Sequence, residues 1–202
     1  MRNIKIFTYL KIILFLLIVF VAVYYPTNEF DVITSNLLQI KILGQTAKII
    51  STIFNDKILL LIMVLLSAFL FWIKEAKKAI FIFFSAGFGG LILFIIKYAV
   101  QRVRPLPEVF SGYSFPSGHS TIIVVFFLSL LFIINKKEIL SILAIFAIIA
   151  VPVSRVVLGA HFISDVVAGL LLGSIVVDFM KVYYKKIYNI IKSITGENKW
   201  IS

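Results

Sequence analysis

The sequence predicts an all-α integral membrane protein, folded as a six-helix bundle that forms one domain over residues 1–202. Two features of its composition predict this class: hydrophobic residues make up 61% of the chain, and charged residues only 14%. A soluble domain of this size needs more charge to cover its surface, so a soluble globular protein is excluded. The third observation is a series of six apolar runs. Each approaches the roughly 20 residues with which a helix crosses the hydrocarbon core.

The charge of the chain indicates which partner it meets. A net charge of +11 would suggest nucleic acid as the partner of a soluble protein. Here the cations flank apolar runs, which favours anionic lipid headgroups of a bilayer and excludes a nucleic-acid partner. The chain has no cysteine, so disulfides, thiol catalysis and Cys-ligated metals are excluded.

The six runs are spread along the whole chain, and the first begins near the N-terminus. The chain continues with Tyr24-Tyr25-Pro26 at the end of this run, where a signal peptide would carry a small-residue cleavage site, so we expect a retained anchor. Lys11 lies close enough to one end of this run for its ammonium group to reach the membrane surface. The predicted spans are about Ile6–Tyr25, Lys57–Ile73, Ala79–Ile96, Pro116–Ile134, Ile139–Val157 and Phe162–Val182.

The orientation follows from the distribution of cations, because cytoplasmic loops carry the excess of Lys and Arg. The richer set of span ends carries Arg2, Lys5, Lys11, Lys74, Lys77, Lys78, Lys136, Lys137, Lys181, Lys185, Lys186, Lys192 and Lys199. The poorer set carries Lys41, Lys48, Lys57, Lys97, Arg102, Arg104 and Arg155. We therefore expect both termini to be cytoplasmic, in the cell's inner (cytoplasmic) membrane. Four cations of the poorer set lie in or beside the motifs described below, where a ligand accounts for them.

Two further segments are expected to lie at the membrane surface. Over Ile33–Ile53, apolar residues recur at helical spacing on the outer side. Near the C-terminus, a stripe of isoleucines from Ile187 to Ile194 accompanies lysines, which predicts a basic amphipathic helix on the cytoplasmic leaflet. For Glu197–Ser202, a solvated tail is an equal alternative.

Ionisable residues near a membrane core are costly and mark functional sites. In this chain they form three clusters, all at the outer ends of spans. The first runs from Lys97 to Arg104-Pro105, and if the third span continues, the two cations share a helix face and can hold an anion. Pro105 disfavours further helix. The alternative for these two cations is ordinary contact with the membrane interface.

The second cluster is Pro116-Ser117-Gly118-His119. Proline suits the first turn of a helix, and Gly118 lets a ligand approach the backbone closely. The unpaired N–H groups of a helix start form a natural phosphate site, where His119 can donate a proton. The alternative is a simple helix start with Ser117 as its cap.

The third cluster runs from Ser154-Arg155 to His161 and Asp165. Because His161 and Asp165 are four residues apart at the start of the sixth span, they are expected to share a face and form a hydrogen bond. A carboxylate that holds one ring nitrogen leaves the other free as a nucleophile or base. Zinc binding is an alternative, but few other ligands lie on this side, so we expect neither metal nor cofactor.

The glycines of the third and sixth spans are expected to serve packing. Gly169 and Gly173 continue the face of His161 and Asp165, and small residues there allow another helix to come close. The same role is expected for Gly87, Gly89 and Gly90 in the third span.

Together the clusters place three cations, two histidines and one carboxylate on one side of the membrane. Three cations and the amides of a helix start match the charge of a transferring phosphoryl group. One oriented histidine can attack phosphorus and the other can protonate the leaving oxygen. The residues thus suffice for phosphoryl transfer through a phosphohistidine without metal.

The three motifs resemble, in order and spacing, the signature of the type 2 phosphatidic acid phosphatases (PAP2). The matching positions are Lys97, Arg104, Pro105, Pro116, Ser117, Gly118, His119, Ser154, Arg155, His161 and Asp165. The resemblance implies His161 as nucleophile, Asp165 as its orienting partner and His119 as general acid and later base. It implies that Lys97, Arg104 and Arg155 clamp the phosphate with help from Ser117 and Gly118, in a metal-free, all-helical protein. The distribution of cations places this active site on the outer (periplasmic) side.

The resemblance does not select one lipid phosphate. Members of this family act on phosphatidate, phosphatidylglycerophosphate, polyprenyl diphosphates, lipid A phosphates and sugar phosphates. A small six-span chain resembles the bacterial members, and undecaprenyl diphosphate is the first expectation for its substrate. The loop Leu106–Ser114 and the stretch Ile33–Ile53 are expected to frame the entry for the lipid.

Three alternatives to a hydrolase are open. A lipid phosphotransferase would use the same phosphohistidine with an acceptor other than water. A vanadate-dependent haloperoxidase has a related pocket but is soluble. A non-enzymatic lipid-binding protein, such as a carrier or scaffold, needs no nucleophile.

Overall fold

The computed structural model of the chain describes residues 6–39, 41–135 and 137–195. These residues fold into α1 (Ile6–Tyr24), α2 (Glu29–Leu38), the short 3-10 helix η1 (Lys41–Leu43), α3 (Gly44–Ile53), α4 (Asp56–Trp72), α5 (Ala76–Val100), α6 (Gly118–Ile133), α7 (Glu138–Val157) and α8 (Ile163–Thr195). No strand occurs in these ranges, so the predicted all-α class is confirmed.

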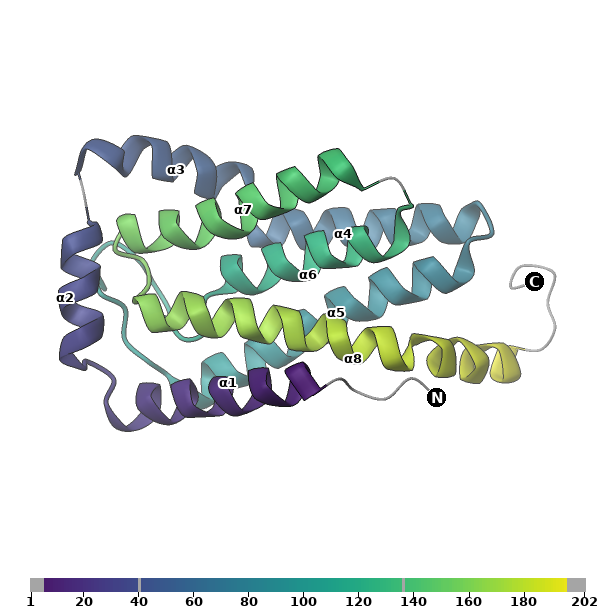
Figure 1. Cartoon of the computed structure of the whole chain (residues 1–202), viewed down its shortest axis with the longest axis horizontal. Helices are drawn as coiled ribbons and strands as arrows, with labels where there is room; N and C mark the ends of the chain where they lie inside the picture. The colour runs from purple at the N-terminus through teal and green to yellow at the C-terminus, as the bar shows by residue number, and fades with distance from the viewer. Residues whose placement is uncertain (1–5, 40, 136, 196–202) are drawn as a thin grey trace.

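The helices have the length and composition of a membrane protein. Within the described chain, five helical stretches are long and apolar enough to cross a membrane: Ile6–Tyr24, Gly44–Trp72, Ala76–Val100, Glu138–Val157 and Ile163–Ile194. A shorter apolar helix covers Gly118–Ile133. α1 begins and α8 ends at the same end of the bundle (Figure 1). That this end is cytoplasmic stays a prediction.

The central helix of the bundle is α6, which contacts α4, α5, α7 and α8. Its residues Ile122, Ile123 and Val125 are fully buried, as an apolar helix surrounded by others requires. α8 approaches α6 most closely: a Cβ atom at Gly169 would lie 2.7 Å from the Ser117 carbonyl oxygen, and one at Gly173 would lie 2.5 Å from the Thr121 carbonyl oxygen. The packing role predicted for these two glycines is therefore confirmed.

The glycines of α5 differ among themselves. A Cβ at Gly89 would lie 3.2 Å from Val125, so this position does pack against α6. A Cβ at Gly87 would meet nothing within 4 Å, and one at Gly90 would only touch Leu60 at 4.0 Å. The packing role predicted for Gly87 is wrong, because this side of α5 faces away from the bundle.

The stretch Ile33–Ile53, which was predicted to lie along the membrane surface, contains two α-helices with different directions. α2 lies across the end of the bundle, whereas α3 runs alongside α7 (Figure 1). Ala47 and Ser51 are the buried residues of α3, and their small side chains allow this contact. The expectation that the whole stretch follows the membrane surface is therefore wrong for α3.

The C-terminal stripe also differs from the prediction. α8 continues without a break to Thr195, so the predicted surface helix is the last part of this long helix. Ile187 and Ile191 pack against a small cluster formed by Ala76, Ile80 and Tyr188. Residues Glu197–Ser202 lie outside the described ranges.

α1 is attached to α8 by a polar contact, in addition to the apolar residues that it packs against the core. The ammonium group of Lys11 lies 2.7 Å from Asp178 Oδ2 and donates to Ser174 Oγ at 2.6 Å. Thr8 also donates to Asp178 Oδ2, at 3.0 Å. The ammonium group of Lys11 is therefore paired within the bundle instead of extending to the membrane surface as expected.

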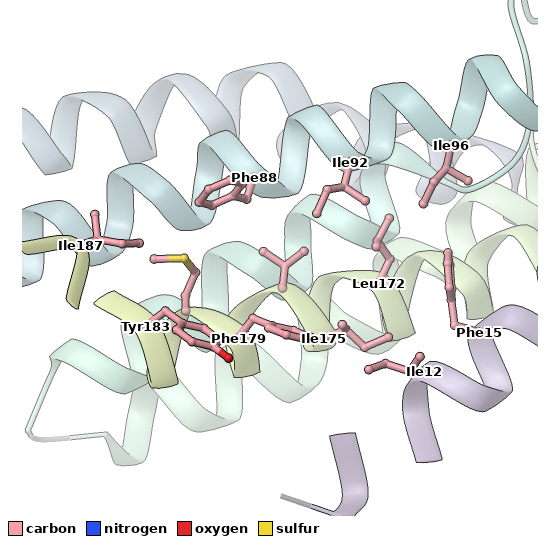
Figure 2. Close-up of a pocket in the computed structure, with 12 residues that line it drawn as sticks. Ile12, Phe15, Phe88, Ile92, Ile96, Leu172, Ile175, Phe179, Tyr183 and Ile187 are labelled. Carbon is pink, nitrogen blue, oxygen red and sulfur yellow. The ribbon is translucent and has the colours of Figure 1, made fainter. Parts of the chain in front are cut away.

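Beside this contact, an apolar groove of about 470 Å³ lies between α1, α5 and α8. Figure 2 shows Ile12 and Phe15 of α1 facing it from one side, with Ile92 of α5 and Leu172 of α8 on the others. The inner part of the bundle is thus apolar and incompletely filled. The polar residues that can do chemistry lie at the end of the bundle near α2.

Candidate active site

The three clusters of ionisable residues meet at the end of the bundle that α2 crosses. Lys97 Nζ donates to the Pro116 carbonyl at 2.9 Å, which joins the first cluster to the second. Arg104 Nη1 lies 3.2 Å from His161 Nε2, which joins the first cluster to the third. The amide of Ser117 donates to the carbonyl of Asp165 at 3.0 Å. Residues that are distant in sequence therefore form one site.

The first cluster reaches the site by a route other than the predicted one. α5 ends at Val100, and Gln101 adopts a left-handed conformation with φ of 51°. Lys97 and Arg104 therefore do not share a helix face, because Arg104 lies in the loop 101–117. This loop turns back over the helix end: Arg104 Nε donates to the carbonyl oxygens of Ser111 and Gly112 at 3.0 and 3.1 Å.

The second cluster forms the start of α6. The helix begins at Gly118, with Ser117 as N-cap, so Pro116 precedes the first turn rather than occupying it. Ser117 Oγ accepts from the amide of Ser120 at 3.4 Å and from its hydroxyl at 3.0 Å. The capping function of Ser117 is therefore present, and it leaves other amides of the first turn without an intrahelical partner.

Gly118 has a neighbour that the sequence analysis did not identify. A Cβ at Gly118 would lie 2.6 Å from Oδ2 of Asp56, the first residue of α4. The other oxygen, Oδ1, lies 3.6 Å from Nδ1 of His119. A carboxylate thus fills the space beside Gly118 and faces His119. In the sequence, Asn55-Asp56 looks like an ordinary helix start.

The third cluster lies where α7 ends and α8 begins. Arg155, in the last turn of α7, donates through Nη1 to Ser51 Oγ on α3. Its Nε is buried and has no hydrogen-bond partner among the described residues. Gly159, with φ of 68°, then turns the chain in a left-handed conformation that favours glycine. An arginine with a buried, unused donor is suited to bind an anion.

His161 precedes α8 instead of sharing a face within it. The chain still brings the two side chains together, because the amide of Phe162 donates to Asp165 Oδ2 at 2.9 Å. His161 Nδ1 lies 3.6 Å from the same oxygen, which is longer than a hydrogen bond, and the imidazole side chain is only 3% exposed. The two side chains are therefore neighbours, as predicted, but the predicted hydrogen bond is not formed, and Nδ1 is buried without a hydrogen-bond partner among the described residues.

The neighbours of His161 define its tautomer. A guanidinium group can only donate, so the contact of Arg104 Nη1 requires Nε2 to be the accepting, unprotonated nitrogen. The ring proton then lies on Nδ1, toward Asp165. Burial lowers the pKa of His161 to about 3, against the opposing effect of Asp165. The imidazole is therefore neutral near pH 7, with a free electron pair on Nε2.

Asp165 is held by an arginine whose role was not predicted. Arg102 Nη1 lies 2.7 Å from Asp165 Oδ1, and its Nη2 lies 2.7 Å from Asp31 Oδ2 on α2. All three side chains are at most 1% exposed. Ser164 completes the network by donating its hydroxyl to Asp31 at 2.6 Å. In the sequence, Arg102 was only one of several outer cations.

The site contains few groups that bind metals. Among residues 6–39, 41–135 and 137–195, no three His, Asp or Glu side chains form a group that could hold a metal ion. Metal-free chemistry stays a prediction, as does the absence of a cofactor. What the site does present is a cluster of cations, formed by Lys97, Arg104 and Arg155, around two histidines.

Comparison with known proteins agrees with this arrangement. The model of the PAP2 superfamily matches residues 78–188. Phosphatidylglycerophosphatase B of Bacillus subtilis (strain 168) is 32% identical over 140 residues, which cover 64% of this chain and 69% of that protein. Lipid A 1-phosphatase of Rhizobium johnstonii is 35% identical over 107 residues, which cover 46% of this chain and 43% of that protein.

A solved structure shows the same fold. The crystal structure of a transmembrane PAP2 type phosphatidylglycerolphosphate phosphatase from Bacillus subtilis superposes with a TM-score of 0.73 at 26% identity. The superposition covers 89% of this chain and 96% of the other. The family match spans more than half of the chain and includes all three motifs. The chain therefore belongs to the PAP2 superfamily and is a membrane phosphatase of this type.

Proposed function

We propose that the protein removes a phosphate group from a membrane lipid in two steps, through a phosphohistidine on His161 and without a metal ion. The observation that supports this most directly is the state of His161. Its Nε2 lies 3.2 Å from Arg104 Nη1, a group that can only donate, and its Nδ1 lies 3.6 Å from Asp165 Oδ2, so the ring proton is assigned to Nδ1. Three cations, Lys97, Arg104 and Arg155, accompany this histidine, and they match the charge of a phosphoryl group in transfer.

In the first step, the electron pair of His161 Nε2 forms a bond to phosphorus while the bond from phosphorus to the leaving oxygen breaks. His119 gives its proton to that oxygen, so the lipid alcohol leaves neutral. The phosphate draws Arg104 from Nε2 to its own oxygens, and the positive charge that develops on the imidazole of His161 is stabilised by Asp165. Arg155 Nε, Lys97 and the first amides of α6, with Ser117 and Gly118, bind the remaining oxygens.

In the second step, His119 accepts a proton from water as the water oxygen attacks phosphorus. The bond between phosphorus and Nε2 breaks, which releases inorganic phosphate and restores the neutral imidazole of His161. Both histidines end in their starting states, so the cycle balances without another reactant.

For the lipid, phosphatidylglycerophosphate is the substrate that the relatives favour, since both the curated and the solved Bacillus proteins bear that name. Undecaprenyl diphosphate, the first expectation from sequence, uses the same phosphate clamp, as do phosphatidate and lipid A. We place the protein in the inner membrane with its site on the outer side, because the richer set of cations lies at the other end of the spans.

The test is phosphate release by the purified protein in detergent from these four lipids, with and without EDTA. We expect the fastest release from phosphatidylglycerophosphate, no loss in EDTA, and a fall of at least about 10⁴-fold in His161→Ala. Substantial activity in that variant would contradict the phosphohistidine. Loss in EDTA with recovery in zinc would contradict the metal-free mechanism.

The same assay separates the alternatives. Labelled phosphate that appears on a lipid acceptor instead of in water would identify a phosphotransferase. Neither release into water nor transfer to an acceptor, from any of the lipids and with the protein folded, would favour a non-enzymatic lipid-binding protein.

A further inference from the structure

Asp56 is a partly buried neighbour of His119 and lies outside all three motifs. It is the first residue of α4, and His119 is the second residue of α6. Asp56 Oδ1 lies 3.6 Å from His119 Nδ1, with 25% of the Asp56 side chain and 13% of the His119 side chain exposed. This distance equals that between His161 Nδ1 and Asp165 Oδ2. The site thus contains two histidine–carboxylate pairs.

The local structure holds this carboxylate at two helix starts. Asn55 caps α4 by accepting from the amides of Lys57 and Ile58. Asp56 Oδ1 itself accepts from the amide of Lys57 at 3.1 Å. The positive ends of α4 and α6 both favour negative charge at this point. Gly118 leaves the space that Oδ2 occupies, because a Cβ there would lie 2.6 Å from that oxygen.

The charges around His119 show why a carboxylate matters there. Burial opposes a positive charge on the ring, and so do the charges of Arg155 of α7 and Arg104 of the loop 101–117. Among the described charged groups that face His119, Asp56 is the one that favours a positive charge. A general acid must carry its proton when the leaving oxygen departs.

We infer that Asp56 is a positioning residue for His119: it orients the imidazolium by accepting a hydrogen bond from Nδ1–H, so that Nε2 presents the other proton to the leaving oxygen. The inference rests on the proposed function, in which His119 is the general acid. In the first step, the Nε2–H bond breaks, the proton passes to the leaving oxygen, and neutral His119 keeps the Nδ1 proton toward Asp56. Asp56 stays a carboxylate throughout.

The experiment exploits the dependence of general-acid catalysis on the leaving group. A good leaving group such as p-nitrophenolate departs without a proton, whereas an alkoxide needs one. We would measure kcat/KM for p-nitrophenyl phosphate and for octyl phosphate in the wild type, Asp56→Asn, His119→Ala and the double variant. Glu29→Gln, which removes an exposed carboxylate from the first turn of α2, is the matched control.

We expect Asp56→Asn to lower kcat/KM about 100-fold for octyl phosphate and less than about fivefold for p-nitrophenyl phosphate. The basic limb of its pH profile should move to lower pH, because the protonated ring has lost its carboxylate. The double variant should be no slower than His119→Ala, since Asp56 acts through His119. Glu29→Gln should match the wild type.

Equal losses of Asp56→Asn on both esters, or a double variant slower by the product of the single losses, would overturn the inference. If Asp56→Asn does not fold, Asp56→Glu makes the same test. Because the charge is retained, the ratio of kcat/KM for the two esters should stay near that of the wild type. A ratio near that of His119→Ala would overturn the inference. A wild type that hydrolyses neither ester nor any lipid would overturn the proposed function itself, and the inference with it.

Discussion

The two histidine–carboxylate pairs of the site have the same separation but different origins. His161 and Asp165 are four residues apart, and one turn at the start of α8 brings them together in a nearly fully buried position. His119 and Asp56 come from different helices and are partly exposed. The first pair is supported by the buried Arg102 and the second by helix starts. The difference teaches that a nucleophile can be fixed rigidly, whereas a proton donor must stay in contact with the leaving group.

The largest expected effect comes from breaking the buried pair. Asp165→Asn removes the acceptor of the Nδ1 proton and leaves Arg102 without one of its two carboxylates. We expect kcat to fall by about 10³–10⁴-fold, as when the carboxylate that orients a catalytic histidine is neutralised. Because the nucleophile is affected, kcat should fall equally for octyl phosphate and p-nitrophenyl phosphate. A loss restricted to octyl phosphate would show that Asp165 serves the proton donor instead.

The second effect is on stability. Arg102→Met leaves Asp31 and Asp165 buried without their shared cation, and breaking such a pair costs about 3–5 kcal/mol. We expect the free energy of unfolding in detergent to fall by this amount. In the double variant Arg102→Met/Asp31→Asn, part of the loss should be recovered, because one uncompensated charge is gone. An unchanged unfolding free energy would show that water reaches the network.

A smaller effect is expected at Gly118. Gly118→Ala places a methyl group where Asp56 Oδ2 lies, so the carboxylate must move away from His119. We expect kcat/KM to fall about tenfold for octyl phosphate and to change little for p-nitrophenyl phosphate. The matched control is Gly87→Ala, whose methyl group meets nothing within 4 Å. Equal rates for the two glycine variants would contradict the contact.

The smallest expected effect concerns pH: the imidazole of His161 should not take up a proton in the range where a free histidine does. Because burial lowers the pKa of His161 to about 3, its neutral form should persist as the pH falls from 8 to 5. The nitrogen NMR signals of histidine in the His119→Asn variant report this directly, since the chain has only two histidines. Signals that titrate near pH 6.5 would show that the imidazole is exposed to water.

Much of this site could be predicted from sequence because ionisable residues stand out in apolar helices. Lys97, Arg104, Arg155, His119, His161 and Asp165 were all identified in this way, and the structure brings them together. Their arrangement was less predictable. The left-handed turn at Gln101 ends α5 before Arg104, and the actual path of the loop 101–117 depends on contacts with Lys97 and the α7–α8 turn.

By itself, the sequence determined the all-helical membrane class, the apolar runs and the chemistry-bearing residues, because composition and short spacing are local properties. Only the tertiary structure decided that Asp56 faces His119, that Arg102 joins Asp31 to Asp165, and that α3 brings Ser51 to Arg155. In a chain of hydrophobic helices, any polar residue near a span end resembles a cap or an interfacial anchor. Its partner is chosen by packing between helices distant in sequence, and no local pattern records that packing.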